Sequence, residues 1–201
     1  MKQKILCVVV FVVMLISNAD ALTILSPGAT WEYTFVDPTS DPTWNNTTGV
    51  GGIWLSGPAP FGNVYSGDFG YQFGTYWPEN WSWGDDLWVK TSVDLSGFDL
   101  SSVRWDIGVD NGFTLYTNGF LVAGYNAEGY AGRWEYSGDF SGVSLNQGTN
   151  IIAVALEDHG VLTAFDMQIT GDHVVPEPST LLLLGSGLSG LGVLARLRKK
   201  V

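Results

Sequence analysis

Carboxylates are the most abundant reactive side chains in this sequence, and several of them are adjacent. Asp85 and Asp86 form one pair, Glu157 and Asp158 form another, and Asp166 follows shortly afterwards. Calcium is a hard cation that prefers oxygen ligands supplied by loops. These five residues are therefore candidate ligands of a structural calcium ion, the one cofactor that the sequence indicates. The alternative is that they are solvated aspartates that shape turns.

Aromatic rings form a second group with a recognisable chemistry. Tyr76, Trp77, Trp81 and Trp83 lie close together in a segment rich in glycine. Sugar-binding proteins stack pyranose rings on such side chains, because the C–H face of the sugar is apolar and the aromatic face is electron-rich. These four residues are the candidate sugar-binding residues. The alternative is that they fill the ends of a hydrophobic core.

Motifs for nucleophilic or metal-dependent catalysis are missing from the sequence. His159 and His173 are the only histidines, no serine stands in a G-x-S-x-G turn, and neither H-E-x-x-H nor a phosphate-binding loop occurs. Glycoside hydrolysis needs only two carboxylates at a suitable separation, which an acidic chain can meet by chance. We therefore predict no catalytic residues and expect that the protein is not an enzyme.

The charge of residues 22–175 restricts the partners. This segment has three basic and 18 acidic residues, which gives a net charge of −15. Phosphate binding needs positive charge, so the sequence predicts no nucleic-acid partner. Cations, neutral sugars and basic proteins remain compatible with this charge.

The N-terminus has the three parts of a secretory signal peptide. Two lysines precede the uncharged run Ile5–Ile16, and Ala19 and Ala21 form an A-x-A cleavage site. The predicted leader covers residues 1–21. The only cysteine, Cys7, lies within it, so we expect no disulfide in the exported chain.

Residues 22–172 are typical of one β-rich domain, because no long stretch has the helical period of 3.6 residues. Segments of alternating or β-branched residues predict seven strands. These are Thr30–Val36, Leu87–Leu95, Val103–Asp110, Phe113–Thr117, Phe120–Ala123, Gly148–Leu156 and Val161–Thr170. Leu87, Val89, Thr91 and Val93 share one face of the second predicted strand, and Val103, Trp105, Ile107 and Val109 share one face of the third. The dipeptides at 111–112 and 118–119 are both Asn-Gly, which predicts a tight turn at each and a hairpin on either side of Phe113–Thr117. The expected fold class is all-β, a single antiparallel β-sandwich of jelly-roll type.

The segment 173–201 has three successive parts. Val175, Pro176, Glu177 and Pro178 form a hinge that proline keeps extended. An uncharged helix over 181–195 would span roughly 22 Å, which is short against a hydrocarbon core of about 30 Å. Its predicted membrane-anchoring residues are Leu181, Leu182, Leu183, Leu184, Leu188, Leu191, Val193 and Leu194. A basic end then stops transfer, and its residues are Arg196, Arg198, Lys199 and Lys200.

This order of P-E-P hinge, short apolar helix and basic end resembles the PEP-CTERM sorting signal of Gram-negative bacteria. The resemblance implies an exported protein whose tail is recognised by exosortase, an integral-membrane processing enzyme, often in organisms that make exopolysaccharide. An ordinary C-terminal membrane anchor is the alternative.

The strings D-N-G-F-T-L-Y-T-N-G and G-T-N-I-I-A-V within residues 86–170 resemble galactose-binding-domain-like jelly rolls. Such modules accompany glycoside hydrolases and other surface proteins, and they often hold a structural calcium. The resemblance supports the fold more directly than any ligand.

These features predict an exported surface or extracellular-matrix protein, anchored at least transiently in the membrane, with a non-catalytic module that binds carbohydrate. Its predicted partners are an exosortase-type enzyme, the membrane through the C-terminal helix, and exopolysaccharide. A small glycan-acting hydrolase and a purely structural matrix protein without a ligand are the alternatives.

Overall fold

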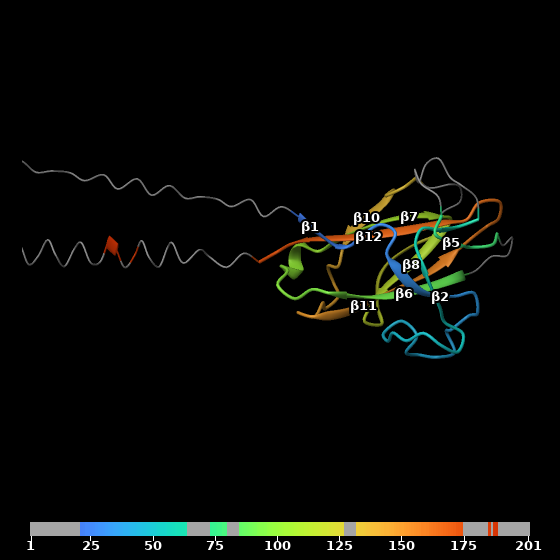
Figure 1. Cartoon of the computed structure of the whole chain (residues 1–201), viewed down its shortest axis with the longest axis horizontal. Coiled ribbons are helices and arrows are strands. Elements are labelled where there is room, and N and C mark those ends of the chain that lie inside the picture. The colour runs from blue at the N-terminus through green and yellow to red at the C-terminus, as the bar shows by residue number, and fades with distance from the viewer. Residues whose placement is uncertain are drawn as a thin grey trace, which may run out of the picture.

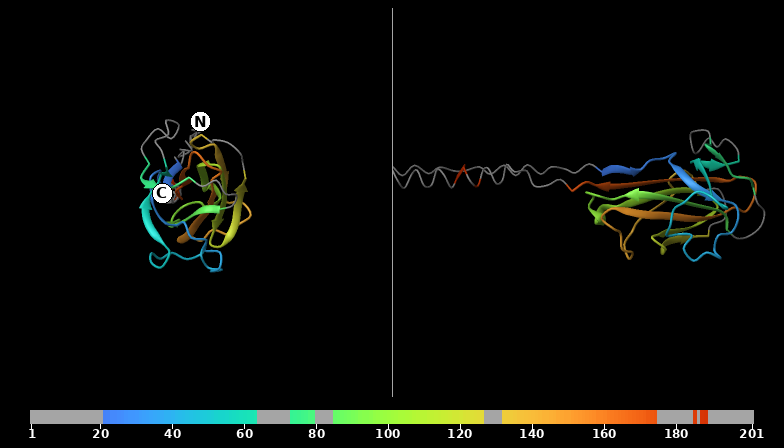
Figure 2. Two further views of the ribbon diagram at one scale, coloured as in Figure 1. Left: turned by 90° about the vertical axis from the view of Figure 1, so that its right-hand side faces the viewer. Right: turned by 60° about the horizontal axis from the view of Figure 1, so that its bottom comes forward.

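The computed structural model describes residues 21–63, 73–79, 85–126 and 132–174, together with the helical residues Gly185, Gly187 and Leu188. Strands β1–β12 form two sheets that pack face to face (Figures 1 and 2). The predicted class, an all-β sandwich, is confirmed. The predicted signal peptide up to residue 20 and nearly all of the tail from residue 175 lie outside the described residues.

The first sheet has the order β10-β7-β12-β4-β5, and β1 pairs with β12 on the same side as β4. Its strands are β1 (Ala21–Leu25), β4 (Phe61–Gly62), β5 (Thr75–Tyr76), β7 (Arg104–Asp110), β10 (Tyr136–Asp139) and β12 (Ala164–Asp172). All pairs are antiparallel except β4 with β5.

The second sheet has the order β3-β2-β6-β11-β8-β9. Its strands are β2 (Thr30–Thr34), β3 (Leu55–Pro58), β6 (Asp85–Asp94), β8 (Gly112–Thr117), β9 (Phe120–Tyr125) and β11 (Thr149–Glu157). The 3-10 helix η1 (Leu100–Ser102) lies in the chain between β6 and β7. All pairs in this sheet are antiparallel.

The main core lies between the sheets and follows the alternation of the strands. Every second residue of β6, β7, β11 and β12 points inward, because successive side chains of a strand point to opposite faces. The inward residues include Leu87, Val89, Trp105, Ile107, Val109, Ile152, Val154, Leu156, Phe165, Met167 and Ile169, all buried. The face predicted for residues 103–110 is therefore the core face.

A second, smaller cluster covers the outer face of the second sheet. The loop between β2 and β3 carries Trp44 and Trp54 onto Trp88, Ala153 and Ala155. Residues on both faces of β11 are thus buried, which explains its nearly continuous apolar sequence.

Buried Lys90 lies under the same loop. Its Nζ is 3.8 Å from the ring centroid of Trp54 and 3.8 Å from the carboxylate of Glu32. The cation–π contact holds this loop against β6, and Glu32 of β2, which pairs with Lys90, also accepts the backbone N–H of Gly49 in the loop.

The predicted hairpin at Asn111 and Gly112 is wrong, because β7 and β8 belong to different sheets. The backbone N–H of Asn111 donates to the carbonyl of Glu157 at 2.8 Å, so the chain crosses from one sheet to the other at this point. Glycine is required at 112 for space: a Cβ there would lie 2.9 Å from the carbonyl oxygen of Tyr125. The turn at 118–119 does join β8 to β9, with φ values of 50° and 85°, as predicted.

The strands end at two opposite poles of the sandwich. Ala21 at the start of β1 lies opposite Asp172 at the end of β12, and we call this pole the tail-proximal end. At the other pole, the tail-distal end, Asp85 lies opposite Glu157, and Asp110 lies opposite Ala164. The loops of the tail-distal end lie at the right of Figure 1.

The first residues of the predicted tail are held to the domain. Phe98 and His173 form a β-bridge, and the backbone N–H of Val174 donates to the carbonyl of Gly97 at 2.7 Å. Among the described residues, no helix is long and apolar enough to cross a membrane. Most of the predicted anchor, residues 181–195, lies outside them.

Candidate functional site

Two cavities lie side by side at the tail-distal end, and Asp85 lines both of them. It does so because β6 begins at this pole, between β2 and β11. The larger cavity has a volume of about 420 Å³ and is lined by Phe35, Asp37, Trp77, Pro78, Glu79, Asp85, Asp86 and Trp88. The smaller has a volume of about 270 Å³ and is lined by Asp85, Phe113, Thr114, Gly124, Tyr125, Asn126 and Glu157.

The smaller cavity lies on the outer face of the second sheet and is lined mainly by polar groups. Thr114 and Glu157 share this face, and the side-chain amide of Asn126 donates to Glu157 Oε2 at 3.0 Å. The Tyr125 ring lies on the opposite face, because successive side chains of a strand alternate, and it packs on Tyr136 and Phe113. The larger cavity supplies the exposed ring, that of Phe35, which is 41% exposed. An aromatic ring near carboxylate, amide and hydroxyl groups is the chemistry that binds a hydroxyl-rich ring.

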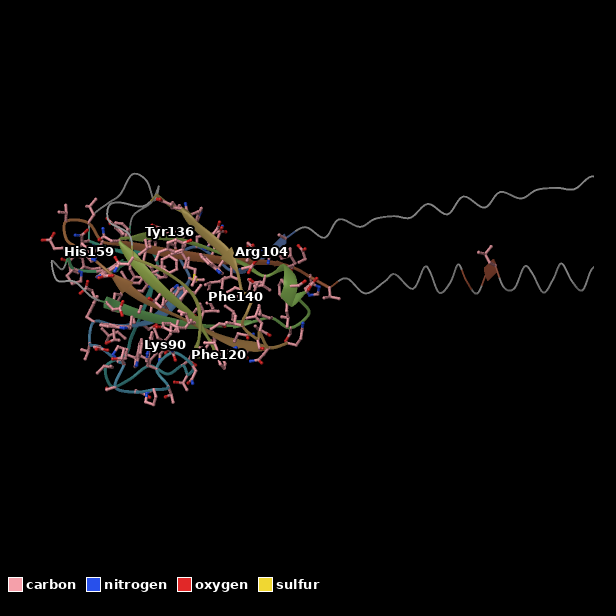
Figure 3. The ribbon with its side chains drawn as sticks, turned by 180° about the vertical axis from the view of Figure 1, so that it is seen from behind. Lys90, Arg104, Phe120, Tyr136, Phe140 and His159 are labelled. Atoms are coloured by element: carbon pink, nitrogen blue, oxygen red, sulfur yellow. The ribbon has the colours of Figure 1, made fainter. Side chains whose placement is uncertain are left out.

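Glu157 also connects the cavity to the loop that follows β11. His159 Nε2 lies 3.0 Å from Glu157 Oε1, and the backbone N–H of His159 donates to the side-chain oxygen of Asn111 at 2.7 Å. Figure 3 shows His159 at the pole remote from η1 and Arg104. These contacts hold the carboxylate of Glu157 from the side opposite Asn126.

Two carboxyls at this end have raised pKa values. Burial raises the pKa of Asp85 to about 6, assisted by the negative charges of Glu157, Asp86 and Asp37. Burial also raises the pKa of Asp110 to about 7; the charge of Asp158 adds to this shift, and His159 opposes it. Acids with such values cluster at functional sites in many proteins.

The five predicted calcium ligands do not form one site. Among the described residues, no group of three or more histidine, cysteine, aspartate or glutamate side chains is arranged to hold a metal ion. Asp86 Oδ2 accepts the backbone N–H of Asp158 at 2.9 Å. Asp166 Oδ1 accepts those of Gly28 at 3.2 Å and Met167 at 2.9 Å. The prediction is corrected because these carboxylates bind backbone groups of their own chain.

The predicted sugar-binding aromatics have different positions. Trp77 is fully buried in the main core, so its ring offers no stacking face, and this part of the prediction is corrected. Tyr76 on β5 is 66% exposed. Trp81 and Trp83 lie outside the described residues. Sequence reasoning missed Phe35, which lies in the predicted strand Thr30–Val36 and lines the larger cavity.

Comparison with solved structures identifies the class of the domain. The β-glucuronidase from Ruminococcus gnavus in complex with C6-substituted uronic isofagomine has a TM-score of 0.50 and 16% identity, over 78% of this chain and 30% of that chain. Its apo structure has a TM-score of 0.49 and 14% identity, over 80% of this chain and 30% of that one. The chain thus spans about 30% of that enzyme's length, and the likeness concerns the fold, a β-sandwich.

The C-terminal tail matches a known protein-sorting signal. Residues 174–199 match the PEP-CTERM protein-sorting motif, which confirms the resemblance of the tail. The motif implies export, transient membrane anchoring and sorting by exosortase, a membrane enzyme. It begins at Val174, which Gly97 holds in place, directly after His173, which bridges to Phe98. No curated protein matches the chain.

Proposed function

We propose that this exported protein displays a non-catalytic carbohydrate-binding module at the cell surface or in the extracellular matrix. The observation that carries the proposal is the pair of cavities that meet at Asp85. They combine acidic side chains with a partly exposed aromatic ring, as sugar-binding surfaces do. Exopolysaccharide is the proposed ligand in the cell.

The position of the cavities supports display of this kind. The nine residues of β12 run from the tail-distal end to the point where the tail begins. A tail inserted in, or processed at, the membrane therefore leaves the cavities at the far end of the sandwich, where they can meet a glycan in the surroundings.

The strand order supports a jelly roll as the finer description of the fold. Numbered one to eight in chain order, the strands concerned are β1, β6, β7, β8, β9, β10, β11 and β12. They are arranged 1-8-3-6 in the first sheet and 2-7-4-5 in the second. This is the arrangement of two combined Greek keys, a fold that many surface binding modules share.

Sorting is tested by the mass and location of the protein in its own host, with and without the exosortase. We expect the mature protein to lack residues 1–21 and the basic tail, and the full tail to persist in the deletion strain. An intact tail in both strains would mean that residues 181–195 serve only as an anchor.

Glycan binding is tested with the exported protein against a panel of polysaccharides, using affinity electrophoresis. Phe35→Ala removes the exposed ring of the larger cavity, and we expect it to lower affinity at least tenfold. Tyr76→Ala is the control, because it removes an exposed aromatic ring from β5, outside both cavities. Loss of binding in Tyr76→Ala alone would move the site to β5. Absence of binding to every polysaccharide would favour a purely structural matrix protein.

One observation favours the alternative of a glycan-acting hydrolase. Asp110 is 4% exposed, and with a pKa of about 7 it can keep a proton at neutral pH, as a general acid must. We expect no hydrolysis of glycans by the exported protein. Turnover that disappears in Asp110→Asn would establish the hydrolase instead.

A further inference from the structure

We infer that the tail-distal end selects a cationic amino sugar, with the ammonium group of the sugar bound beside Asp85 at the junction of the two cavities. This inference rests on the proposed glycan binding and specifies the class of glycan. It excludes uronic acids and predicts a preference over neutral sugars of the same backbone.

The sign of the charge around Asp85 carries the first step. Asp37, Glu79 and Asp86 line the larger cavity with Asp85, Glu157 lines the smaller one, and no lysine or arginine is among the described residues that line either. The mutual repulsion of these acids contributes to the raised pKa of Asp85. A bound ammonium group relieves that repulsion, whereas a carboxylate on the ligand adds to it.

The distribution of the acids carries the second step. They are spread along two adjoining cavities with a combined volume near 700 Å³, and Asp86 already accepts the backbone N–H of Asp158. A single small cation contacts only one part of such a surface. An extended chain that repeats its positive charge from ring to ring can pair with acids in both cavities.

The aromatic and hydroxyl groups favour a sugar over a basic peptide. Phe35 lines the larger cavity and is 41% exposed, so this cavity offers an apolar ring face for the C–H side of a pyranose. Thr114 and Asn126 supply hydrogen-bonding groups for ring hydroxyls in the smaller cavity. A lysine side chain uses the acids but not this combination.

The test measures affinity by titration calorimetry at pH 7. The ligands are a glucosamine tetrasaccharide, its fully N-acetylated form, cellotetraose, a galacturonate tetrasaccharide and tetralysine. We expect the glucosamine tetrasaccharide to bind the exported protein at least tenfold more tightly than the N-acetylated form, and the galacturonate ligand not to bind.

Asp85→Asn and Asp94→Asn are matched variants, because they remove the same charge from the two ends of β6. We expect at least a tenfold loss for glucosamine in Asp85→Asn and less than a twofold loss in Asp94→Asn. Equal losses would mean non-specific attraction to an acidic protein and would overturn the inference. Tetralysine binding as tight as glucosamine binding would overturn it in favour of a basic protein partner.

The neutral ligands separate this inference from the proposed function. If the N-acetylated or cello-oligosaccharide binds as tightly as the glucosamine form, the amino-sugar inference fails and carbohydrate binding stands. If none of the saccharides and no polysaccharide of the panel binds, both fail.

Discussion

The two ends of the sandwich use the same side chain in opposite ways. At the tail-proximal end, aspartates accept hydrogen bonds from the backbone N–H and the hydroxyl of a serine two residues later. These pairs are Asp94 with Ser96, Asp99 with Ser101 and Asp139 with Ser141. The hydrogen bonds lower the pKa of each aspartate. At the tail-distal end, burial raises the pKa of Asp85 and Asp110.

The difference shows which acids are available to a ligand. A carboxylate that accepts two local hydrogen bonds stabilises its own turn. A carboxylate that is buried near other acids is costly when ionised, and a ligand that supplies a positive charge or a hydrogen-bond donor offsets this cost. The tail-proximal acids therefore serve the fold, as does Asp37 at the tail-distal end, which accepts the backbone N–H of Thr39, whereas Asp85 is the acid suited to recognition.

The largest effect on stability is expected for Asn150, a buried side chain that joins the loops of the tail-proximal end by hydrogen bonds. Asn150 Oδ1 accepts from the Asn146 backbone N–H at 2.8 Å and from Asn118 Nδ2 at 2.9 Å, and its Nδ2 donates to the carbonyls of Asn146 and Gly148 at 2.9 Å each. Asn150→Ala removes all four hydrogen bonds of this buried side chain, so we expect it to reduce the free energy of unfolding by about 3 kcal/mol.

Urea denaturation of the exported protein measures this change. Asn146→Ala is the control, because Asn150 contacts only the backbone of Asn146 and the side chain of Asn146 is exposed. An equal loss in both variants would show that the loop, rather than the Asn150 network, sets the stability of this end.

Asp110 provides the next largest effect, at the tail-distal end. The pKa of Asp110 in the folded chain is about 7, above the 3.8 of an ordinary aspartate. The folded chain therefore binds more protons than the unfolded chain between these pH values. The contribution of Asp110 is therefore fully present below pH 4 and is lost as the pH rises through 7. Asp110→Asn removes this pH dependence. We therefore expect the free energy of unfolding of the variant, relative to that of the wild type, to rise by about 3 kcal/mol between pH 4 and pH 8.

Thermal unfolding at a series of pH values measures the gain. A constant difference between Asp110→Asn and the wild type across this range would show that Asp110 has an ordinary pKa and that the contrast between the two ends is smaller than proposed.

Much of the fold follows from local patterns in the sequence. Alternation placed the core faces of β6 and β7, and Asn118-Gly119 placed the β8–β9 hairpin. The other Asn-Gly dipeptide failed as a guide because its geometry depends on a distant partner, the carbonyl of Glu157. A local pattern cannot distinguish a tight turn from a crossing between sheets.

The candidate site was less predictable for a related reason. The sequence identifies Asp85 and Glu157 as acids that could bind a ligand. The cavities that they line depend on which strand ends meet, and this is a property of the strand order. Trp77 was assigned to a binding surface because its surroundings are rich in glycine, whereas packing against the core decides its exposure. Local sequence reports the chemistry of a side chain better than its accessibility.

Gly112 allows a smaller but more local test of the tail-distal end. A Cβ at this position would lie 2.9 Å from the Tyr125 carbonyl oxygen and 3.3 Å from Glu157 Oε2, so Gly112→Ala must displace the wall of the smaller cavity. We expect it to reduce the free energy of unfolding by about 1–2 kcal/mol and to weaken glycan binding. Gly132→Ala is the control, because Gly132 lines neither cavity and a Cβ there would meet no atom within 4 Å. Equal calorimetric affinities in the two variants would place the ligand outside the smaller cavity.

The smallest effect is expected for a single aspartate of the tail-proximal end, and its pH dependence has the opposite sign to that of Asp110. Hydrogen bonds from Ser101 lower the pKa of exposed Asp99, so its contribution is present above pH 4 and disappears as the pH falls through the lowered value. Asp99→Ala should shift the urea midpoint slightly at pH 7 and not at pH 2, whereas Asp99→Asn keeps an acceptor for Ser101 and should change the midpoint less. A larger shift in acid than at neutral pH would contradict the assignment of this end to local turn formation and would remove the contrast with the tail-distal acids.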